Sequence, residues 1–343
     1  MSGMSVRSGE PRRPRVGGGT HSPLLAGARI EAGIEMSPRS SDFPFVSMLR
    51  AAFAAEAPYF VNSFDRAAAM FGEEWARNFE VTLRELLGAE PAVTAAVQGY
   101  ADFAMDALRL HKRFEKTGEY EAKSYADASS EVYLNAGYMN DLYLPGIMLS
   151  HFLWPHHYRQ RLFFEANFLP EMSAKAGSAR FAEIGTGTGY YSRLALTRVA
   201  DSRCDGFDIS PSSAAYTRRQ WQAFGVEERA ALHLKDITRE APAGEFDWAV
   251  SVEVLEHLED PTGFLAAIHR MMRPEGKAFI TAALNAPNAD HIYLYRHPDE
   301  VRRQLEEVGF TIEQYYFGSA YRPRTAGVPV PESAAFIVSR GEP

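Results

Sequence analysis

The sequence predicts an α/β protein in which an all-α segment precedes a mostly parallel sheet. From residue 43 to about 172, apolar residues recur at three- and four-residue spacing, which indicates amphipathic helices. After Ser178, short apolar runs alternate with helical stretches, which is typical of β-α-β units in a parallel sheet. A glycine-rich turn follows the first of these runs, within FAEIGTGTGYYS at Phe181–Ser192.

Composition changes divide the chain into three parts: residues 1–42, 43–172 and 173–343. The first is rich in Gly, Ser, Pro and Arg and lacks periodic apolar positions, so we expect a disordered tail. A dispensable tail is favoured over a regulatory or targeting segment. The second part is too long for a lead-in helix, and we expect a helical domain that binds substrate, forms a lid or mediates oligomerisation.

Boundary signals support the helices of the second part. Gly88 is suited to end one helix, and Pro91 is suited to the first turn of the next. The predicted helices are Phe45–Ala55, Val61–Met70, Glu73–Leu87 and Pro91–Phe114.

The third part contains the alternating elements. The predicted strands are Arg180–Ile184, Cys204–Asp208, Ala230–Lys235, Trp248–Val252, Lys277–Ala283, Phe310–Phe317 and Ala335–Ser339. The predicted helices are Tyr191–Arg198, Ser212–Phe224, Pro261–Met272 and Pro298–Val308. Right-handed crossovers between parallel strands would place all the connecting loops that carry motifs at one edge of the sheet.

Charge and cysteine content exclude several classes of function. The net charge is −8, and an acidic protein is a poor partner for nucleic acid. No apolar run approaches the roughly 20 residues of a membrane span, so we expect a soluble protein without a membrane partner. Cys204 is the only cysteine, which excludes a disulfide framework and a thiolate metal site and favours a cytoplasmic location.

The glycine spacing distinguishes two classes of nucleotide cofactor. A strand, a glycine turn and a helix together place backbone N–H groups beside a bound ligand. The dinucleotide fingerprint is G-x-G-x-x-G, whereas this chain has Glu183-x-Gly185-x-Gly187-x-Gly189. The carboxylate two positions before the first glycine favours S-adenosylmethionine over NAD.

Three further strings follow in a matching order: GFDIS, LKDIT and FDWAVSVEVLEHLEDP. Together with the glycine turn they resemble the class I S-adenosylmethionine-dependent methyltransferases, of the small-molecule type similar to the ubiquinone and menaquinone biosynthesis enzymes. The resemblance covers about Ala174 to Arg340. It implies a Rossmann-like sheet with an antiparallel last strand, S-adenosyl-L-methionine as the cofactor and methyl transfer as the reaction.

The resemblance also implies roles for individual residues. The glycines would approach the methionine part of the cofactor, Glu183 would orient the loop or meet the amino group, Asp208 would accept the ribose hydroxyls, and Asp236 would meet the adenine amino group. The alternatives are a turn without a ligand, a helix cap and an ordinary turn aspartate. The predicted cofactor-binding residues are Glu183, Gly185, Thr186, Gly187, Gly189, Asp208, Ile209, Asp236, Ile237 and Glu253.

Two stretches are candidates for the acceptor side. The segment between Tyr125 and Phe168 combines aromatic residues with histidines, a mixture suited to a small-molecule pocket, although the same residues would also suit a core. The loop after the fifth strand, NAPNADHIYLY, faces the acceptor in similar enzymes. The predicted substrate-binding residues are Tyr138, Tyr143, His151, Trp154, Tyr293 and Tyr295.

Candidate catalytic groups depend on the acceptor atom. An oxygen or nitrogen acceptor would lose its proton to a neutral histidine such as His157 or His291, and a carbon acceptor to a carboxylate such as Glu165. For His257 a structural role is favoured, and the role of Glu256 is open. No metal site is expected, because neighbouring histidines such as His156 and His157 point in different directions on a helix.

These observations predict methylation of a small aromatic or isoprenoid-like metabolite of specialised biosynthesis, at oxygen, nitrogen or carbon. Two other classes are open: a protein or nucleic-acid methyltransferase, and a non-catalytic subunit that binds the cofactor. The helical part is a candidate surface for a homo-oligomer.

Overall fold

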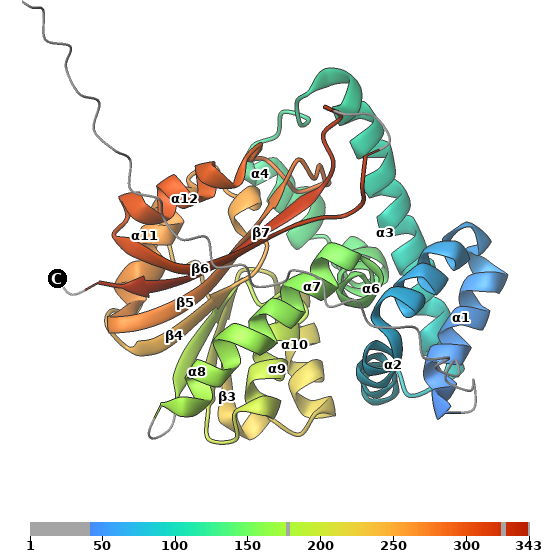
Figure 1. Ribbon diagram of the computed structural model, residues 1–343, viewed down its shortest axis with the longest axis horizontal. Helices are drawn as coiled ribbons and strands as arrows, with labels where there is room; N and C mark the ends of the chain where they lie inside the picture. The colour runs from blue at the N-terminus through green and yellow to red at the C-terminus, as the bar shows by residue number, and fades with distance from the viewer. Residues whose placement is uncertain (1–41, 176–178, 324–326, 342–343) are drawn as a thin grey trace, which may run out of the picture. The chain divides into compact units, whose positions relative to one another are not determined.

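A sheet covered by helices lies beside a further group of helices from the N-terminal half of the chain (Figure 1). The computed structural model describes residues 42–175, 179–323 and 327–341. Except for Asp42, the predicted tail lies outside the described residues.

The sheet of the described residues has seven strands in the order β3-β2-β1-β4-β5-β7-β6. Strands β1 to β5 pair in parallel, and β7 is antiparallel to both β5 and β6. This confirms the predicted mostly parallel sheet with an antiparallel last strand. The strands are β1 (Arg180–Ile184), β2 (Arg203–Asp208), β3 (Ala230–Leu234), β4 (Phe246–Ser251), β5 (Met272–Leu284), β6 (Phe310–Ser319) and β7 (Glu332–Arg340).

This strand order reverses direction between β1 and β4. In open parallel sheets, ligands bind beyond the carboxyl ends of the strands at such a reversal. Glu183 of β1 lies opposite Val250 of β4, so the loops that follow these two strands are neighbours. The glycine turn after β1 and Glu253 after β4 therefore meet at one edge of the sheet.

Residue types at the first turn explain where the helices between the strands begin. A proline lies in the first turn of α10, α11 and α12, and Ser210 and Asp260 cap the first two by accepting hydrogen bonds from Ser213 N and Gly263 N. His297 caps α12 through its side chain. The helices are α9 (Tyr190–Arg198), α10 (Pro211–Ala223), η6 (Glu227–Arg229), η7 (Leu255–His257), α11 (Pro261–Met271) and α12 (Pro298–Glu307).

The first helices are α1 (Pro44–Glu56), η2 (Pro58–Phe60), α2 (Val61–Leu86) and α3 (Glu90–Thr117). Gly72 interrupts α2 with a φ of 68°, at the break expected between Met70 and Glu73. Gly88 has a φ of 67° just beyond the end of α2, and Pro91 lies in the first turn of α3. A left-handed glycine is a common helix terminator, so both boundaries follow from residue type.

Short helical pieces occupy most of the chain between α3 and β1, and several of them are π-helical. The wider π turns expose backbone and commonly occur near functional sites. The pieces are α4 (Tyr125–Ala128), η3 (Ser129–Tyr133), α5 (Ala136–Tyr138), η4 (Met139–Tyr143), α6 (Leu144–Leu153), α7 (Pro155–Phe163), η5 (Phe164–Phe168) and α8 (Leu169–Ala174).

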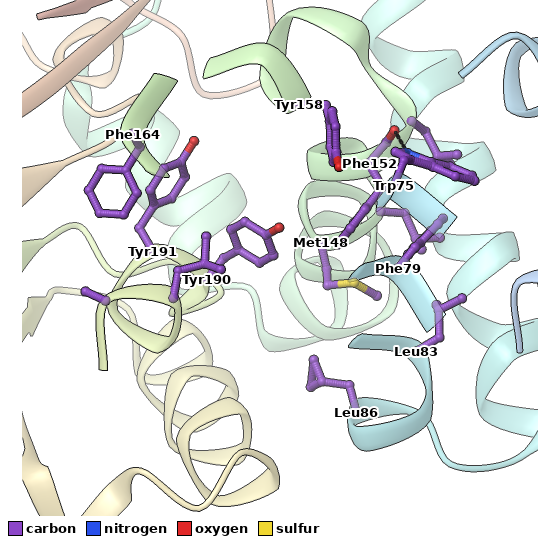
Figure 2. Packing of buried hydrophobic residues seen from close by; sticks show 14 of the residues in the cluster. Trp75, Phe79, Leu83, Leu86, Met148, Phe152, Tyr158, Phe164, Tyr190 and Tyr191 are labelled. Atoms are coloured by element: carbon purple, nitrogen blue, oxygen red, sulfur yellow. Dashed lines mark hydrogen bonds between the residues drawn. The ribbon is translucent and has the colours of Figure 1, made fainter. Parts of the chain in front are cut away.

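One buried core continues from the helices into the sheet (Figure 2). The rings of Phe79 and Phe152 stack with centroids 4.2 Å apart, and Trp75 Nε1 donates a hydrogen bond to the Phe152 carbonyl at 2.9 Å. Further along, Phe164 packs against Tyr191 at 5.1 Å. The predicted division at residue 172 is therefore not marked by separate cores, and it stays a prediction.

Within the described ranges, no helix is both long and apolar enough to cross a lipid bilayer.

Candidate active site

A cavity of about 760 Å³ lies between the carboxyl ends of the strands and the helices α1 to α8, which we call the helical half. Its floor is formed by the loops after β1, β2, β3 and β4, and its opposite wall by α3, α6 and α7. Ligand pockets commonly measure about 300 to 1,000 Å³, so this space is suited to a cofactor together with a small acceptor.

The glycine turn after β1 lines the cavity in a conformation that requires glycine. Gly185, Gly187 and Gly189 have φ values of 72°, 52° and 69°. A Cβ atom on Gly185 would lie 2.5 Å from Val254 Cγ2, and one on Gly189 would lie 2.8 Å from Thr217 Cγ2. At Gly187 nothing lies within 4 Å, so this position leaves room for a ligand close to the backbone.

Glu183 lies below this turn at the end of β1 and is almost fully buried. Its Oε2 atom has no hydrogen-bond partner among the described residues. Burial raises the pKa of Glu183 to about 8, although hydrogen bonds from Ser192 partly oppose the rise. A buried, unpaired carboxyl of this kind is suited to a cationic ligand group, which would restore the ionised form.

Asp208 joins the end of β2 to the glycine turn. Its carboxylate accepts hydrogen bonds from Gly187 N at 3.0 Å, from Thr186 Oγ1 at 3.2 Å and from Ser210 N at 2.8 Å. Burial raises its pKa, and these hydrogen bonds oppose the rise. Ser210, not Asp208, caps α10, so the alternative role as helix cap is wrong.

The next two strand ends add polar groups and an apolar surface. Asp236 accepts hydrogen bonds from Thr238 N at 2.9 Å and Thr238 Oγ1 at 2.6 Å, so it forms a turn and also lines the cavity with Ile237. Glu253 has a φ of 53°, unusual for a residue with a side chain, and it accepts a hydrogen bond from Thr281 Oγ1 at 3.1 Å. Burial and the neighbouring carboxylate of Glu256 raise the pKa of Glu253.

The opposite wall of the cavity is aromatic. Trp154 Nε1 donates a hydrogen bond to the Tyr100 hydroxyl at 3.1 Å, and its ring stacks on Phe103 with centroids 5.7 Å apart. His151 stacks on Tyr190 at 4.3 Å. Further apolar side chains line the same wall: Phe60, Ala104, Leu108, Met139, Leu144 and Ile147.

His157 lines this wall beside Ser150. The Ser150 hydroxyl lies 2.8 Å from the Ile147 carbonyl and 3.1 Å from His157 Nδ1, which holds the imidazole ring in place. Burial lowers the pKa of His157 to about 4, which keeps the imidazole neutral at pH 7.

A buried ion pair lies where the loop after β5, residues 285–295, meets η7. Asp290 Oδ2 lies 3.2 Å from His257 Nδ1 and accepts a hydrogen bond from the Tyr143 hydroxyl at 2.7 Å. The Tyr133 hydroxyl also contacts His257 Nδ1, at 3.0 Å. Burial disfavours the charged imidazole, but the carboxylate of Asp290 outweighs it and raises the pKa of His257 to about 9. These tyrosines tie the helical half to the sheet.

Two further ionisable groups lie beside this pair and line the cavity. Glu256 is fully buried, and neither carboxylate oxygen has a hydrogen-bond partner in the part of the chain that the structure describes. Burial raises the pKa of Glu256, while the charge of His257 and nearby backbone N–H groups lower it. The ring of His291 packs edge-on against His257 at 4.7 Å, and burial lowers the pKa of His291 to about 3.

Most of the predicted site residues line this one cavity, although their roles stay predictions. Those that line it are Glu183, Gly185, Thr186, Gly187, Asp208, Ile209, Asp236, Ile237, Glu253, Tyr143, His151, Trp154, His157 and His291. Gly189 instead begins α9, behind the turn.

Four predicted residues lie elsewhere. The Glu165 carboxylate pairs with Arg161 at 3.0 Å and Arg198 at 3.5 Å, outside the cavity lining, and its role as a proton acceptor stays a prediction. Tyr138 packs behind Tyr143. The hydroxyls of Tyr293 and Tyr295 both hydrogen-bond Gln304 of α12, because this part of the loop returns toward the helix.

Sequence reasoning missed several residues of the cavity and its support. Tyr100 and Phe103 belong to an amphipathic helix, where such positions indicate only a buried face. Tyr133 and Asp290 lie within the two stretches that the sequence singled out, but residue type alone did not separate them from their neighbours. Tyr133 and His257 are 124 positions apart, so their contact required the structure.

Comparison with known proteins identifies the sheet half. A family model described as a methyltransferase domain matches residues 155–315. Residues 155–315 are a methyltransferase domain. The resemblance inferred from the motifs is therefore confirmed, and the cofactor of such a domain is S-adenosylmethionine.

Curated relatives of this methyltransferase domain carry a more specific name. The chain is 31% identical over 127 residues to the ubiquinone biosynthesis O-methyltransferase of Pseudomonas aeruginosa (strain UCBPP-PA14), covering 36% of this chain and 52% of that protein. It is 27% identical over 183 residues to the enzyme of the same name from Aromatoleum aromaticum, covering 45% and 73%. The chain thus spans about half the length of several of the curated relatives that it matches.

Solved structures also resemble this chain. One is a phospholethanolamine N-methyltransferase 2 of Haemonchus contortus, at 14% identity, covering 64% of this chain and 61% of that chain with a TM-score of 0.48. Another is a putative sarcosine dimethylglycine methyltransferase from Galdieria sulphuraria, at 10% identity, covering 54% and 86% with a TM-score of 0.43.

Proposed function

We propose that this chain transfers the methyl group of S-adenosylmethionine to a small, largely apolar acceptor. One observation carries the proposal: a single cavity joins the glycine turn of the methyltransferase domain to an aromatic wall from the helical half. A ligand held by the turn and a second ligand held by the wall would therefore share one space. An aromatic or isoprenoid-like metabolite suits such a wall.

The residues at the strand ends fit the cofactor. The open space at Gly187 suits close backbone contact, the unpaired Glu183 oxygen suits the ammonium group, and Asp208 and Asp236 are placed for the ribose and the adenine. When bound, the cofactor supplies a methyl group that its sulfonium already activates. The protein then has to bind, align and dehydrate the two reactants.

Removal of the acceptor proton is the remaining chemical task. His157 and His291 are both kept neutral by burial, with pKa values of about 4 and 3, so each has a free lone pair at pH 7. The same low pKa values make them weak bases, because proton transfer is most effective when the pKa of the base lies near the working pH. Both stay proposed proton acceptors.

Two alternative functions have less support. A protein or nucleic-acid methyltransferase would need to admit a macromolecule to a cavity lined largely by buried apolar side chains. A non-catalytic subunit would need only the cofactor half, and would leave the aromatic wall without a ligand.

The cofactor assignment predicts that S-adenosylhomocysteine binding releases protons. With a pKa of about 8, Glu183 is about nine-tenths protonated at pH 7. An ammonium group favours the ionised carboxylate, so binding should release about 0.9 proton at pH 7, and affinity should rise about five- to tenfold between pH 7 and 8.5. Calorimetry in buffers of different ionisation enthalpy measures both quantities.

Two variants complete this experiment. Glu183→Gln should abolish the proton release and weaken binding about tenfold, or about 1.4 kcal/mol. Glu245→Gln is the matched control, because Glu245 pairs with Arg180 outside the cavity and should leave both quantities unchanged. Undetectable binding of S-adenosylhomocysteine by the intact chain would contradict the proposal.

A further inference from the structure

We propose that Arg66 binds an oxyanion of the acceptor, a carboxylate or a phosphate, at the mouth of the cavity beside α2, while the apolar part of the acceptor lies along the aromatic wall. The inference rests on the proposed methyl transfer and adds the chemical class of the acceptor, an amphipathic acid. Arg66 is then a specificity-determining residue, remote from the atom that is methylated.

Charged side chains are divided unequally between the two sides of the cavity. In the described part of the chain, the carboxylates that line it all belong to residues from β1 onward, and none belongs to the helical half. Carboxylates suit the cationic cofactor on their own side. A wall without them attracts an anionic acceptor in preference to a cationic one. These carboxylates are those of Glu183, Asp208, Asp236, Glu253, Glu256 and Glu332.

The helical wall carries its charge on Arg66. Four histidines also line this side, His111, His151, His156 and His157. Burial lowers the pKa of each of them, so their imidazoles are neutral at pH 7. An arginine guanidinium stays protonated at this pH. Within the described ranges, Arg66 is therefore the one charged group that the helical half presents to the cavity at neutral pH.

The guanidinium of Arg66 is oriented but is not paired with an acid. Its Nη2 atom donates a hydrogen bond to Ser63 Oγ at 3.1 Å, and its Nε atom donates to the Asn62 carbonyl at 3.2 Å. The neighbouring Asp65 is already bound by Arg50, at 2.7 and 2.8 Å. Ser63 also lines the cavity, and it keeps its own proton because an arginine can only donate. The two side chains together offer several donors to an oxyanion.

Arg66 lies where the cavity opens to solvent. Arg66 and Met70 are both exposed, and both line the cavity. A surface groove lined by Tyr59 and Asn62 shares Ser63 and Arg66 with the cavity and continues the opening outward. An oxyanion at this mouth keeps part of its hydration, so binding it costs less desolvation than burying it beside the cofactor.

A series of ring contacts leads from this mouth along the wall. The rings of Phe60 and Tyr100 lie 5.5 Å apart, and the Tyr100 hydroxyl accepts the hydrogen bond from Trp154. The ring of Trp154 lies 5.0 Å from that of His157, which lies 6.2 Å from that of His151. The wall is therefore several rings long, and an apolar body lying on it separates the oxyanion from the methylated atom.

A second exposed arginine, Arg322, lines a different end of the cavity. It follows Tyr321, whose hydroxyl lies 3.0 Å from His111 Nε2 near the end of α3. Among the residues described, no hydrogen bond orients the Arg322 guanidinium, and the carboxylate of Glu332 lines the cavity from the same hairpin. An oxyanion is therefore better held at Arg66.

The first test measures how four matched probes bind to the full chain saturated with S-adenosylhomocysteine: phenylbutyrate, phenylbutyl phosphate, phenylbutanol and phenylbutylamine. By calorimetry we expect at least one acid to bind about fivefold more tightly than the alcohol, and the amine to bind most weakly. The tighter of the two acids identifies the oxyanion of the acceptor. Added salt should weaken binding of the acid and leave the alcohol unchanged. Equal affinities for the acids and the alcohol, tighter binding of the amine, or no detectable binding of either acid would overturn the proposal.

Two arginine variants locate the effect. Arg66→Met should lower the affinity for the acid about fivefold, to that for the alcohol. Arg322→Met is the matched control, because it removes an exposed arginine at a different end of the cavity and should keep the full preference for the acid. A preference that survives Arg66→Met, or one that is lost in Arg322→Met, would overturn the proposal.

Methyl transfer separates this inference from the proposed function. With the acceptor that labelled S-adenosylmethionine identifies, Arg66→Met should raise KM about fivefold and leave kcat within about twofold, because the oxyanion is bound away from the methylated atom. Transfer to a neutral or cationic acceptor with an unchanged KM in Arg66→Met would overturn the oxyanion site and leave the proposed function standing. Absence of transfer to any small molecule would contradict both.

Discussion

The Gly185→Ala variant is expected to bind S-adenosylhomocysteine about 100-fold more weakly than the natural chain. The added Cβ would lie 2.5 Å from Val254 Cγ2, at a φ of 72°. A left-handed conformation costs about 1 to 2 kcal/mol for a residue with a Cβ, and relieving the contact displaces either the glycine turn or the loop after β4. The displaced turn must return to its original conformation to bind the ligand, and a cost of about 3 kcal/mol for that return corresponds to the expected loss in affinity.

The control for this variant separates backbone strain from the site. Gly225 has a φ of 64° with nothing within 4 Å of an added Cβ, and it lies outside the cavity. Gly225→Ala should lose about 1 kcal/mol of stability and keep the affinity of the natural chain. Calorimetric titration of both variants measures the difference, and a loss below threefold for Gly185→Ala would contradict the assigned role of the turn.

The Phe79→Ala variant is expected to lower the free energy of unfolding by about 3 to 5 kcal/mol. Phe79 is fully buried and stacks on Phe152 at 4.2 Å, in the core that the helices share with the sheet. Because the core is continuous, the helical half and the sheet should unfold in a single transition. Urea denaturation followed by circular dichroism and by tryptophan fluorescence measures both.

An exposed apolar residue provides the control for this experiment. Leu134 is 65% exposed, and Leu134→Ala should change the stability by less than about 0.5 kcal/mol. Two separate transitions, or a loss below 1 kcal/mol for Phe79→Ala, would show that the two halves do not depend on a shared core.

The sheet and the cofactor side were largely predictable from the sequence. Short apolar runs ended at Ile184 and Asp208 as predicted, and the residues after them line the cavity. This succeeds because parallel strands bring consecutive loop motifs to one edge, so order along the chain already indicates proximity. The start of β5 was placed five residues late, at Lys277 instead of Met272.

The acceptor side was less predictable because its contacts join distant parts of the chain. An aromatic residue of an amphipathic helix has the same pattern whether it faces a core or a cavity, so Phe103 carried no distinct signal. Tyr293 and Tyr295 had suitable chemistry, but Gln304 draws their hydroxyls toward α12. The pairing of His257 with Asp290, 33 positions apart, depends on how the loop after β5 folds back over η7.

Methyl transfer itself is measured most directly with S-adenosylmethionine labelled in its methyl group. The purified chain would be incubated with matched sets of small aromatic and isoprenoid alcohols, amines and hydrocarbons, and products would be separated by mass. We expect label in a small-molecule product, with one S-adenosylhomocysteine formed for each methyl group transferred. Tight cofactor binding without label in any small molecule, or label found on protein or nucleic acid, would contradict it.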